Sequence, residues 1–308
     1  MNAPGQPASR HTRRCVDGVL LIDKPAGLTS NAVLGVVKRM FNAAKAGHTG
    51  TLDPFATGLL PVALGEATKF SGHLLAADKT YLATMRLGVT TATADPEGEV
   101  VEVREVHVTR AQLEAVLPAF TGVIDQVPPM YSALKRDGKP LYEYARAGLD
   151  VERASRRAII HALSLVEASG DAVTFRVTCG KGTYVRTLAE DIGRALGCGA
   201  HLSALRRERT GGFGLEAAVT LDALEALTYA QRIDLLQPID ALVRDLTPLH
   251  CDAAVAARLR VGQRVAIHEF GVQLGGRYRA YDAHGTLIGM VDAAAGVVSP
   301  VRLVALAR

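Results

Sequence analysis

The most restrictive feature of this sequence is a strand that leads through a glycine turn into an amphipathic helix, in the second half of the chain. Over residues 173–179 apolar side chains alternate with Thr and Arg, the period of a strand with one face in a core. A Gly-Lys-Gly turn follows at 180–182, and apolar residues then recur at helical spacing up to Gly197, a typical C-cap. The chain must therefore pack a helix against a sheet. Tyr184 and Arg186 lie where that helix begins.

Other segments show the same two periods. An apolar run at 19–22 and an alternating run at 79–87 predict further strands. Thr29 or Ser30 is suited to cap a helix, and the Thr-x-x-Gln sequence at 109–112 is a capping box before another. Strands and helices mixed along the chain predict an α/β fold.

The length and texture of the chain predict its domains. A chain of 308 residues suits roughly two domains. From about Asp245 onward, short strand-like runs alternate with glycine turns, which is typical of a small β-rich domain; the runs cover 264–268, 276–281, 286–291 and 297–306. We therefore expect a disordered extension over 1–16, a main domain over 17–244 and a small β-rich domain over 245–308.

Composition and motif searches exclude several classes of protein. Apolar residues make up 48% and charged residues 21%, the balance of a folded protein. No apolar run approaches the ~20 residues of a membrane helix, and the start lacks a signal-peptide core, so we expect a cytoplasmic location. Phosphate-loop and dinucleotide-binding glycine motifs are absent from the sequence, and the nine His and four Cys lack metal-site spacing. We expect reduced, mostly buried thiols, no metal and no cofactor.

Charge is distributed unevenly along the chain. Residues 91–125 hold two arginines against seven acids, whereas 130–160 hold seven basic residues against four acids and 180–210 hold six against three. A basic middle region is what a polyanion-binding face requires. An ordinary solvated surface gives the same count, and the charges alone favour neither reading.

Asp53 is the first candidate for chemistry. It lies in a polar, glycine-rich stretch from Gly47 to Gly58 that is too broken for a helix and too polar for a core strand, so a long ordered loop is predicted. The pair Asp53-Pro54 fits a helix N-cap with proline at N1, which is the commoner use of such a pair. The alternative is a carboxylate that a ligand approaches closely, kept ionised by a neighbouring cation.

Six groups of residues, in order along the chain, make this sequence similar to the TruB family of tRNA pseudouridine synthases. Gly47-His48-Thr49-Gly50-Thr51-Leu52-Asp53-Pro54 followed by Ala56-Thr57-Gly58 resembles the catalytic motif of the family. The other five groups are Leu21 to Ser30, Lys79-x-Tyr81 with Leu87-Gly88, Pro128 to Lys135 with Leu141 to Arg146, Gly182 to Thr187, and Gly199 to Leu202 with Leu205-Arg206-Arg207. Phe55 departs from the family, which usually has a smaller aliphatic residue there.

The resemblance implies a fold, a reaction and a partner. The fold would be the pseudouridine synthase fold, a mixed, mainly antiparallel sheet with flanking helices, followed by a PUA-like RNA-binding domain. The reaction would convert uridine 55 in the T-loop of tRNA to pseudouridine after base flipping. This isomerisation neither gains nor loses atoms or electrons, so it needs no redox cofactor or metal.

The resemblance also implies roles for five residues around the reacting base. Asp53 matches the essential aspartate, which attacks or deprotonates the flipped nucleotide. Arg186 matches the arginine paired with it, and such a guanidinium would lower the pKa of the carboxyl group. Tyr81 matches the tyrosine that stacks on the target base. Tyr184 would hydrogen-bond and line the pocket, and Leu205 would close it with apolar surface.

Four further residues are implied to bind substrate. His48 matches the histidine that fills the space left by extruded bases, although it also suits a hydrogen bond within its loop. Arg206 and Arg207 suit phosphate oxygens or a solvated surface. Lys24 suits phosphate or, beside its proline, a role in stabilising the turn.

A rival reading from another class keeps the RNA and removes the chemistry. A protein can hold a T-loop by shape and stacking alone, as a tRNA-binding or tRNA-folding module. An intact Asp53 and Arg186 favour the enzyme. We expect tRNA as the partner, no membrane association, no obligatory protein partner and a monomer.

Overall fold

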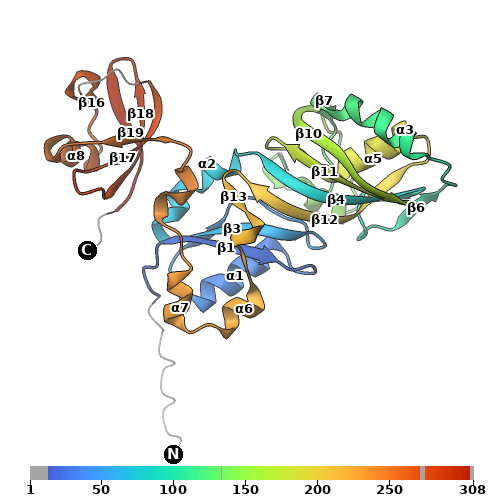
Figure 1. Ribbon diagram of the computed structural model, residues 1–308, viewed down its shortest axis with the longest axis horizontal. Helices are drawn as coiled ribbons and strands as arrows, with labels where there is room; N and C mark the ends of the chain where they lie inside the picture. The colour runs from blue at the N-terminus through green and yellow to red at the C-terminus, as the bar shows by residue number, and fades with distance from the viewer. Residues whose placement is uncertain (1–12, 133, 271–274, 306–308) are drawn as a thin grey trace, which may run out of the picture.

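The computed structural model describes residues 13–132, 134–270 and 275–305. Its main sheet contains the ten strands β1 (Gly18–Lys24), β2 (Ala46–His48), β3 (Thr57–Leu64), β4 (Lys79–Leu87), β7 (Gly122–Gln126), β10 (Arg156–Ser169), β11 (Ala172–Cys179), β12 (Ala200–Thr210), β13 (Phe213–Gly214) and β14 (Val219–Thr220). The strand order is β14-β1-β3-β12-β4-β11-β10-β7, with β2 beside β3 and β13 beside β12 (Figure 1). Paired strands are antiparallel except β1 with β14 and β3 with β12. The predicted mixed, mainly antiparallel sheet is confirmed.

Helices flank this sheet, and two of them start at the predicted capping residues. Thr29 caps α1 by accepting a hydrogen bond from the Ala32 amide at 3.0 Å, and Thr109 and Gln112 form the expected capping box. The helices are α1 (Ser30–Met40), α2 (Ser71–Leu75), α3 (Arg110–Val116), α4 (Leu141–Arg146), α5 (Val185–Ala195), α6 (Leu221–Ala226), α7 (Tyr229–Asp234) and α8 (Ala253–Arg260). Short 3-10 helices are η1 (Gly65–Phe70), η2 (Leu117–Phe120), η3 (Leu215–Ala217), η4 (Ile239–Val243) and η5 (Ile267–Phe270).

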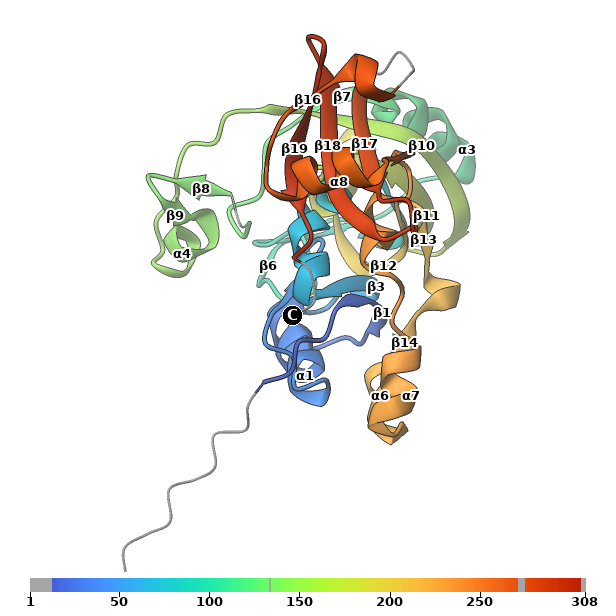
Figure 2. The same ribbon diagram turned by 90° about the vertical axis from the view of Figure 1, so that its left-hand side faces the viewer.

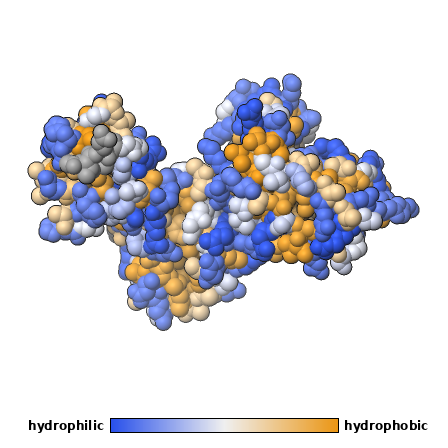
Figure 3. Space-filling view, turned by 45° about the horizontal axis from the view of Figure 1, so that its top comes forward, coloured by the Kyte–Doolittle hydropathy of each residue, from blue (hydrophilic) through white to orange (hydrophobic). Residues whose placement is uncertain are grey.

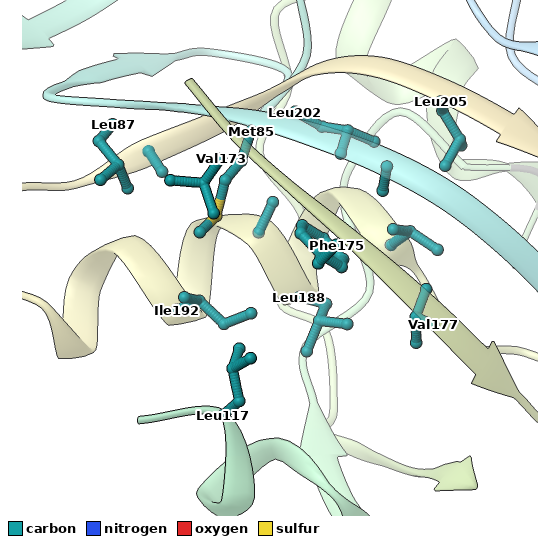
Figure 4. Close-up of a cluster of buried hydrophobic side chains, with 14 of the residues drawn as sticks. Met85, Leu87, Leu117, Val173, Phe175, Val177, Leu188, Ile192, Leu202 and Leu205 are labelled. Atoms are coloured by element: carbon teal, nitrogen blue, oxygen red, sulfur yellow. The ribbon is translucent and has the colours of Figure 1, made fainter. Parts of the chain in front are cut away.

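The largest core lies between α5 and strands β4, β11 and β12. Leu188 and Ile192 of the helix pack with Phe175, Met85 and Leu202 of the sheet, all of them buried (Figure 4). Each such side chain contributes about 1.5–3 kcal/mol to folding when it leaves water. This packing fixes the first turn of α5, and with it Arg186, against the end of the sheet.

The chain between β7 and β10 leaves the body of the molecule. This segment, residues 127–155, contains the two-residue strands β8 (Lys135–Arg136) and β9 (Lys139–Pro140) and helix α4. Figure 2 shows it standing apart from the main sheet. We call it the projection. A second two-stranded sheet, β5 (Val89–Thr91) with β6 (Val100–Val103), extends from the far end of β4.

A separate five-stranded sheet forms the C-terminal part. Its strands are β15 (Thr247–His250), β16 (Val265–Ala266), β17 (Gly276–Tyr281), β18 (Leu287–Ala294) and β19 (Val297–Leu303), in the order β15-β17-β18-β19-β16. With α8 it makes the left-hand lobe of the space-filling view (Figure 3). The strand expected at 264–268 is only two residues long because η5 follows it at once, and the last expected strand, 297–306, ends at Leu303, with 306 outside the described residues.

The predicted disordered extension is mostly outside the described residues, which begin at Arg13. Its last part is ordered, which differs from the prediction: the Arg14 amide donates to the Asn42 carbonyl at 2.8 Å, and Val16 is buried. Within the described ranges, no helix is both long and apolar enough to cross a membrane. All four cysteines are unpaired, and Cys15 alone among them is exposed.

Candidate active site

A cleft of about 1010 Å³ opens where the loop after β2, the start of α5 and the projection meet. Five of the nine predicted site residues line it: Asp53, Tyr81, Tyr184, Arg186 and Leu205. These residues come from four separate segments of the chain, so the fold brings together what the motifs had only listed in order.

Asp53 does not cap a helix. Residues 53–56 form a turn closed by a hydrogen bond from the Ala56 amide to the Asp53 carbonyl at 3.1 Å. The loop is fixed from below by the buried Ser30 hydroxyl, which accepts from the Leu52 amide at 2.8 Å and donates to the Leu52 carbonyl at 3.1 Å. The commoner reading of the Asp-Pro pair is therefore wrong, and the carboxylate is left free for other contacts.

Arg186 is the main partner of Asp53. Its Nε lies 3.1 Å from Oδ2 of Asp53, and its Nη1 lies 3.0 Å from Oδ2 of Asp95. The guanidinium also donates to the Thr93 carbonyl at 3.3 Å and to the Tyr131 carbonyl at 2.7 Å. Only 5% of the Arg186 side chain is exposed, against 33% for Asp53. Because its contacts to Asp95, Thr93 and Tyr131 hold it in place, the Arg186 guanidinium presents a fixed positive charge to Asp53, the more exposed carboxylate.

Asp95 is the functional residue that sequence reasoning missed. Only 3% of its side chain is exposed, and its Oδ1 accepts hydrogen bonds from the Thr93 hydroxyl and, at 3.0 Å, from the Glu97 amide. In the sequence, Asp95 was noted only as one of the seven acids of residues 91–125. Its Asp-Pro pair, the same as at 53–54, is the signal that singles it out.

The pKa of Asp53 moves opposite to the expected direction. Burial in the cleft raises it above the ordinary aspartate value, and the nearby Asp95 charge raises it further. Arg186 lowers it, as predicted, but by less than burial raises it. The sequence argument considered the cation alone, whereas the structure adds desolvation and a second carboxylate that shares the same guanidinium.

Tyr81 and Leu205 form an inner wall of the cleft. They lie on neighbouring strands, where Ala83 of β4 pairs with Leu205 of β12. Tyr81 is half-buried, and burial raises the pKa of its phenol. Both side chains also touch the core against α5, so each is at once a wall residue and a core residue.

Lys24, expected to bind phosphate or to stabilise its turn, and Arg207, expected to bind phosphate or to face solvent, are both buried and hydrogen-bonded within the protein. Lys24 is fully buried, and its ammonium donates to the carbonyls of Pro25, Leu28 and Pro54 at 2.8, 2.6 and 3.1 Å. Burial lowers its pKa to about 8. Arg207 is 1% exposed and donates to the carbonyls of Leu59 and Gly50 at 2.7 and 3.0 Å. Both hold the segment that carries Asp53, and the Lys24 contacts to Pro25 and Leu28 are those of the turn-stabilising alternative.

Arg206 and His48 lie outside the residues that line the cleft. Arg206 is 40% exposed at its side chain and pairs with Asp23 at 2.7 Å, which leaves part of the guanidinium facing solvent. His48 ends β2 and is half-buried, and its Nδ1 has no hydrogen-bond partner among the described residues. Burial lowers its pKa. Among the placed residues no cluster of three or more His, Cys, Asp or Glu is arranged to hold a metal ion.

Comparison with known proteins assigns the chain to a family. The model of the TruB family pseudouridylate synthase N-terminal domain matches residues 38–185, a tRNA pseudouridylate synthase B C-terminal domain matches 186–247, and a pseudouridine synthase II TruB C-terminal model matches 247–304. A protein of Burkholderia mallei named tRNA pseudouridine synthase B is 58% identical over 302 residues, 97% of each chain. One of the same name from Aromatoleum aromaticum is 58% identical over 296 residues, 96% of this chain and 95% of its own.

Solved structures show the same fold. A Cbf5-Nop10-Gar1 complex contains a chain with a TM-score of 0.70 and 30% identity, covering 90% of this chain and 78% of its own. An H/ACA RNP bound to a substrate RNA contains one with a TM-score of 0.71 and 28% identity, covering 93% of this chain and 84% of its own. Together with the relatives that match almost from end to end, these similarities show that the chain belongs to the TruB family of pseudouridylate synthases.

Proposed function

We propose that this chain isomerises uridine 55 in the T-loop of tRNA to pseudouridine, with Asp53 as its essential carboxylate. The observation that carries the proposal is the contact of 3.1 Å between Asp53 and Arg186 in the cleft of a TruB-family chain. Relatives 58% identical to this chain bear the name tRNA pseudouridine synthase B, which supports tRNA as the substrate.

The chemistry is balanced without any added reactant. The bond between N1 and C1′ of the uridine breaks, the uracil turns, and a bond between C5 and C1′ forms. The proton on C5 is lost to solvent and N1 regains one. Asp53 acts either as the nucleophile at C1′ or as the base that takes a ribose proton, and both routes require its ionised form. A uridine within a folded loop must flip out to reach Asp53, at a general cost of a few kcal/mol that stacking on Tyr81 offsets in part.

The surroundings of the cleft support an RNA substrate. The projection carries the exposed residues Lys135, Arg136 and Lys139, and its Arg146 lines the cleft. Exposed cations on a segment that stands apart from the body suit the phosphates of an RNA arm, while the cleft receives the base. We assign substrate contact also to the exposed part of Arg206.

We further propose the domain division at 244/245, with the C-terminal sheet as a PUA-like RNA-binding domain, and a monomeric enzyme of the cytoplasm that needs no protein partner. The side chains assigned to the reaction, Asp53, Tyr81 and Arg186, line one cleft within a single copy of the chain.

The test compares wild type with Asp53→Asn, which keeps shape and removes the charge. Unmodified tRNA carrying tritium at C5 of uridine is incubated with each protein, and released tritium is counted. We expect release by wild type and none by the variant, with equal tRNA affinity in filter binding. Tight binding of tRNA without release by wild type would instead establish the non-catalytic binding module.

A further inference from the structure

A second cavity shares a wall with the cleft. It has a volume of about 570 Å³ and lies between the projection, helix α5 and the segment that follows β5. Thr93 and Tyr131 line both cavities, and their carbonyls accept hydrogen bonds from Arg186 at 3.3 and 2.7 Å. Open space offers a wall no packing contacts. The position of these two carbonyls, and with it that of the guanidinium, therefore depends on the hydrogen bonds that hold the wall.

Arg153 ties the end of the projection to its start, beside this second cavity. Strands β7 and β10 pair as far as Gln126 and Arg156, and the projection runs between them. Beyond that pair, Nη1 of Arg153 donates to the Pro128 carbonyl at 3.2 Å, and Nη2 lies 3.5 Å from Oδ1 of Asp150. Arg153 lines the second cavity, and only 26% of its side chain is exposed. Its guanidinium thus continues the connection between the two strands into the projection.

The segment from Pro128 to Tyr131 is stiff enough to pass this restraint on. Two consecutive prolines, Pro128 and Pro129, fix their own φ angles, and the residue before a proline is confined to extended backbone. At its other end the segment is held by the carbonyl of Ser132, which accepts from the Tyr142 amide at 3.1 Å. A shift of the Pro128 carbonyl therefore displaces the carbonyl of Tyr131.

We propose that Arg153 is a positioning residue for the reaction, which acts on Arg186 through the start of the projection. By holding the Pro128 carbonyl, it keeps the Tyr131 carbonyl where the guanidinium of Arg186 donates to it. This contact in turn keeps the guanidinium beside Asp53. The inference rests on the proposed function, since it concerns how the pair assigned to that reaction is held.

Loss of this tie alters the titration of Asp53 as well as the rate. The groups around Asp53 that titrate or carry charge are Arg186 and Tyr184 at the start of α5, Asp95 and Glu97 after β5, Lys24 of β1 and Tyr81 of β4. Arg186 lowers the pKa of Asp53, so a guanidinium held less firmly leaves that pKa higher. The reaction needs the ionised carboxylate, and activity is then lost at a higher pH. A substitution that only lowers stability does not move this pKa.

Arg153→Met tests the proposal. Each protein is mixed in excess with C5-tritiated tRNA from pH 4 to 8, and urea unfolding checks that the variant is folded. The maximal single-turnover rate is measured together with its ratio to the half-saturating concentration, which reports the free enzyme. We expect the maximal rate to fall about tenfold, in the range of one lost charged hydrogen bond, and the acid limb to move to higher pH.

Arg153→Lys is the milder variant, and it decides the matter if Arg153→Met does not fold. Lysine keeps the charge but has one nitrogen for the two contacts that Nη1 and Nη2 make. We expect a smaller loss of rate and a smaller shift of the acid limb, both in the same direction.

Arg194→Met is the matched control. Arg194 lines the same cavity, but it pairs with Asp191 and Glu190 of its own helix, at 2.7 and 3.5 Å. Its loss removes the same charge and should change neither the rate nor the acid limb. The inference is overturned if Arg153→Met reacts as wild type, if its rate falls with the acid limb in place, or if Arg194→Met moves the limb as far. Absence of tritium release by wild type is a different result, because it removes the proposed function itself.

Discussion

At the scale of single residues, the site is built around one arginine shared by two carboxylates. Arg186 contacts Asp53 and Asp95, and Asp95 is the more deeply buried of the two. The two contacts fix the guanidinium of Arg186 before substrate binds. Its positive charge is then shared between the two carboxylates. Burial therefore dominates the titration of Asp53, and its pKa is raised although a cation is in contact.

A raised pKa at Asp53 predicts an acid limit of activity above the ordinary aspartate range. Both proposed routes need the carboxylate, so activity falls as pH decreases through the pKa of Asp53, and it is retained above it. The measurement is kcat/KM for tritium release between pH 4 and 8, which reports the free enzyme. An acid limb no higher than the ordinary aspartate pKa of 3.8 would contradict this, because it would show that Arg186 lowers the pKa of Asp53 by at least as much as burial raises it.

Asp95→Asn should move that limb to lower pH. The substitution removes a negative charge that raises the pKa of Asp53 and leaves the guanidinium to Asp53 alone. It also weakens an anchor of Arg186, so we expect the maximal rate to fall by about ten- to a hundredfold, in the range of a lost charged hydrogen bond. The pH profile separates the two effects. An unchanged or higher acid limb would count against the electrostatic part.

The residue scale is also where sequence reasoning was weakest. Asp53, Tyr184 and Arg186 line one cleft, because the fold fixes the loop that carries Asp53 and the start of α5 that carries the other two. Arg207 was assigned to substrate or a solvated surface and Lys24 to substrate or its own turn, and both are buried and donate to carbonyls of the loop that carries Asp53. A charged side chain shows its chemistry in the sequence but not its burial, which depends on segments far along the chain.

Lys24→Met therefore tests a structural role. Loss of its three hydrogen bonds should lower the stability by about 2 kcal/mol and slow the reaction, since the Pro54 carbonyl would lose one of its two donors and keep the Gly27 amide. The salt dependence of tRNA binding should stay as in wild type. Lys139→Met in the exposed projection is the comparison, and we expect the slope of log K against log salt to fall there by about one. An equal fall of this slope with Lys24→Met would show that Lys24 contacts a phosphate.

At the scale of elements, the sequence predicted what local periodicity controls. Strands β4 and β11 and helix α5 follow their patterns because their apolar faces bury against one another. The predicted polar loop over 47–58 included Gly47 and His48 of β2 and Thr57 and Gly58 of β3. Strand β2 forms only through pairing with β3, which the local pattern does not contain. Gln126 is a similar case. It ends β7 as a polar residue, yet it is 2% exposed and holds the N-cap of α5.

Gln126→Leu should loosen the start of α5. It keeps most of the volume and removes both hydrogen bonds to the Tyr184 backbone, which leaves the Tyr184 amide without its acceptor and its carbonyl with the Leu188 amide at 3.0 Å. We expect a loss of about 1–3 kcal/mol in urea unfolding and a lower rate of isomerisation, because Arg186 lies in the turn that is released. Leu113→Ala, in the same core but on α3, supplies the control: it should cost stability with little effect on the rate of folded enzyme. Loss of stability without loss of rate in Gln126→Leu would show that α5 is held by packing alone.

At the scale of the whole molecule, the C-terminal sheet is joined to the main sheet by a common core. Met290 of β18 packs in one buried cluster with Phe70 and Leu242 from the main body. Polar contacts surround this junction: Lys69 donates to the Leu303 carbonyl at 2.9 Å, and the Ala305 amide donates to Glu66 at 2.6 Å. The change of texture near Asp245 indicated a separate unit, and a unit of about 60 residues needs to dock on a partner domain, but the sequence does not show which residues make that contact.

The shared core predicts that the two parts unfold together. Met290→Ala leaves a cavity between the parts, so it should lower the free energy of unfolding by about 2–4 kcal/mol. The midpoint of one cooperative thermal transition should fall accordingly. Val298→Ala, in the separate core of the C-terminal sheet, is the matched substitution. If the parts are coupled as the packing indicates, both variants shift the same single transition, seen alike by far-ultraviolet circular dichroism and calorimetry. Two resolved transitions, of which both variants move only one, would show that the C-terminal sheet folds independently and that its contact with the main body adds little stability.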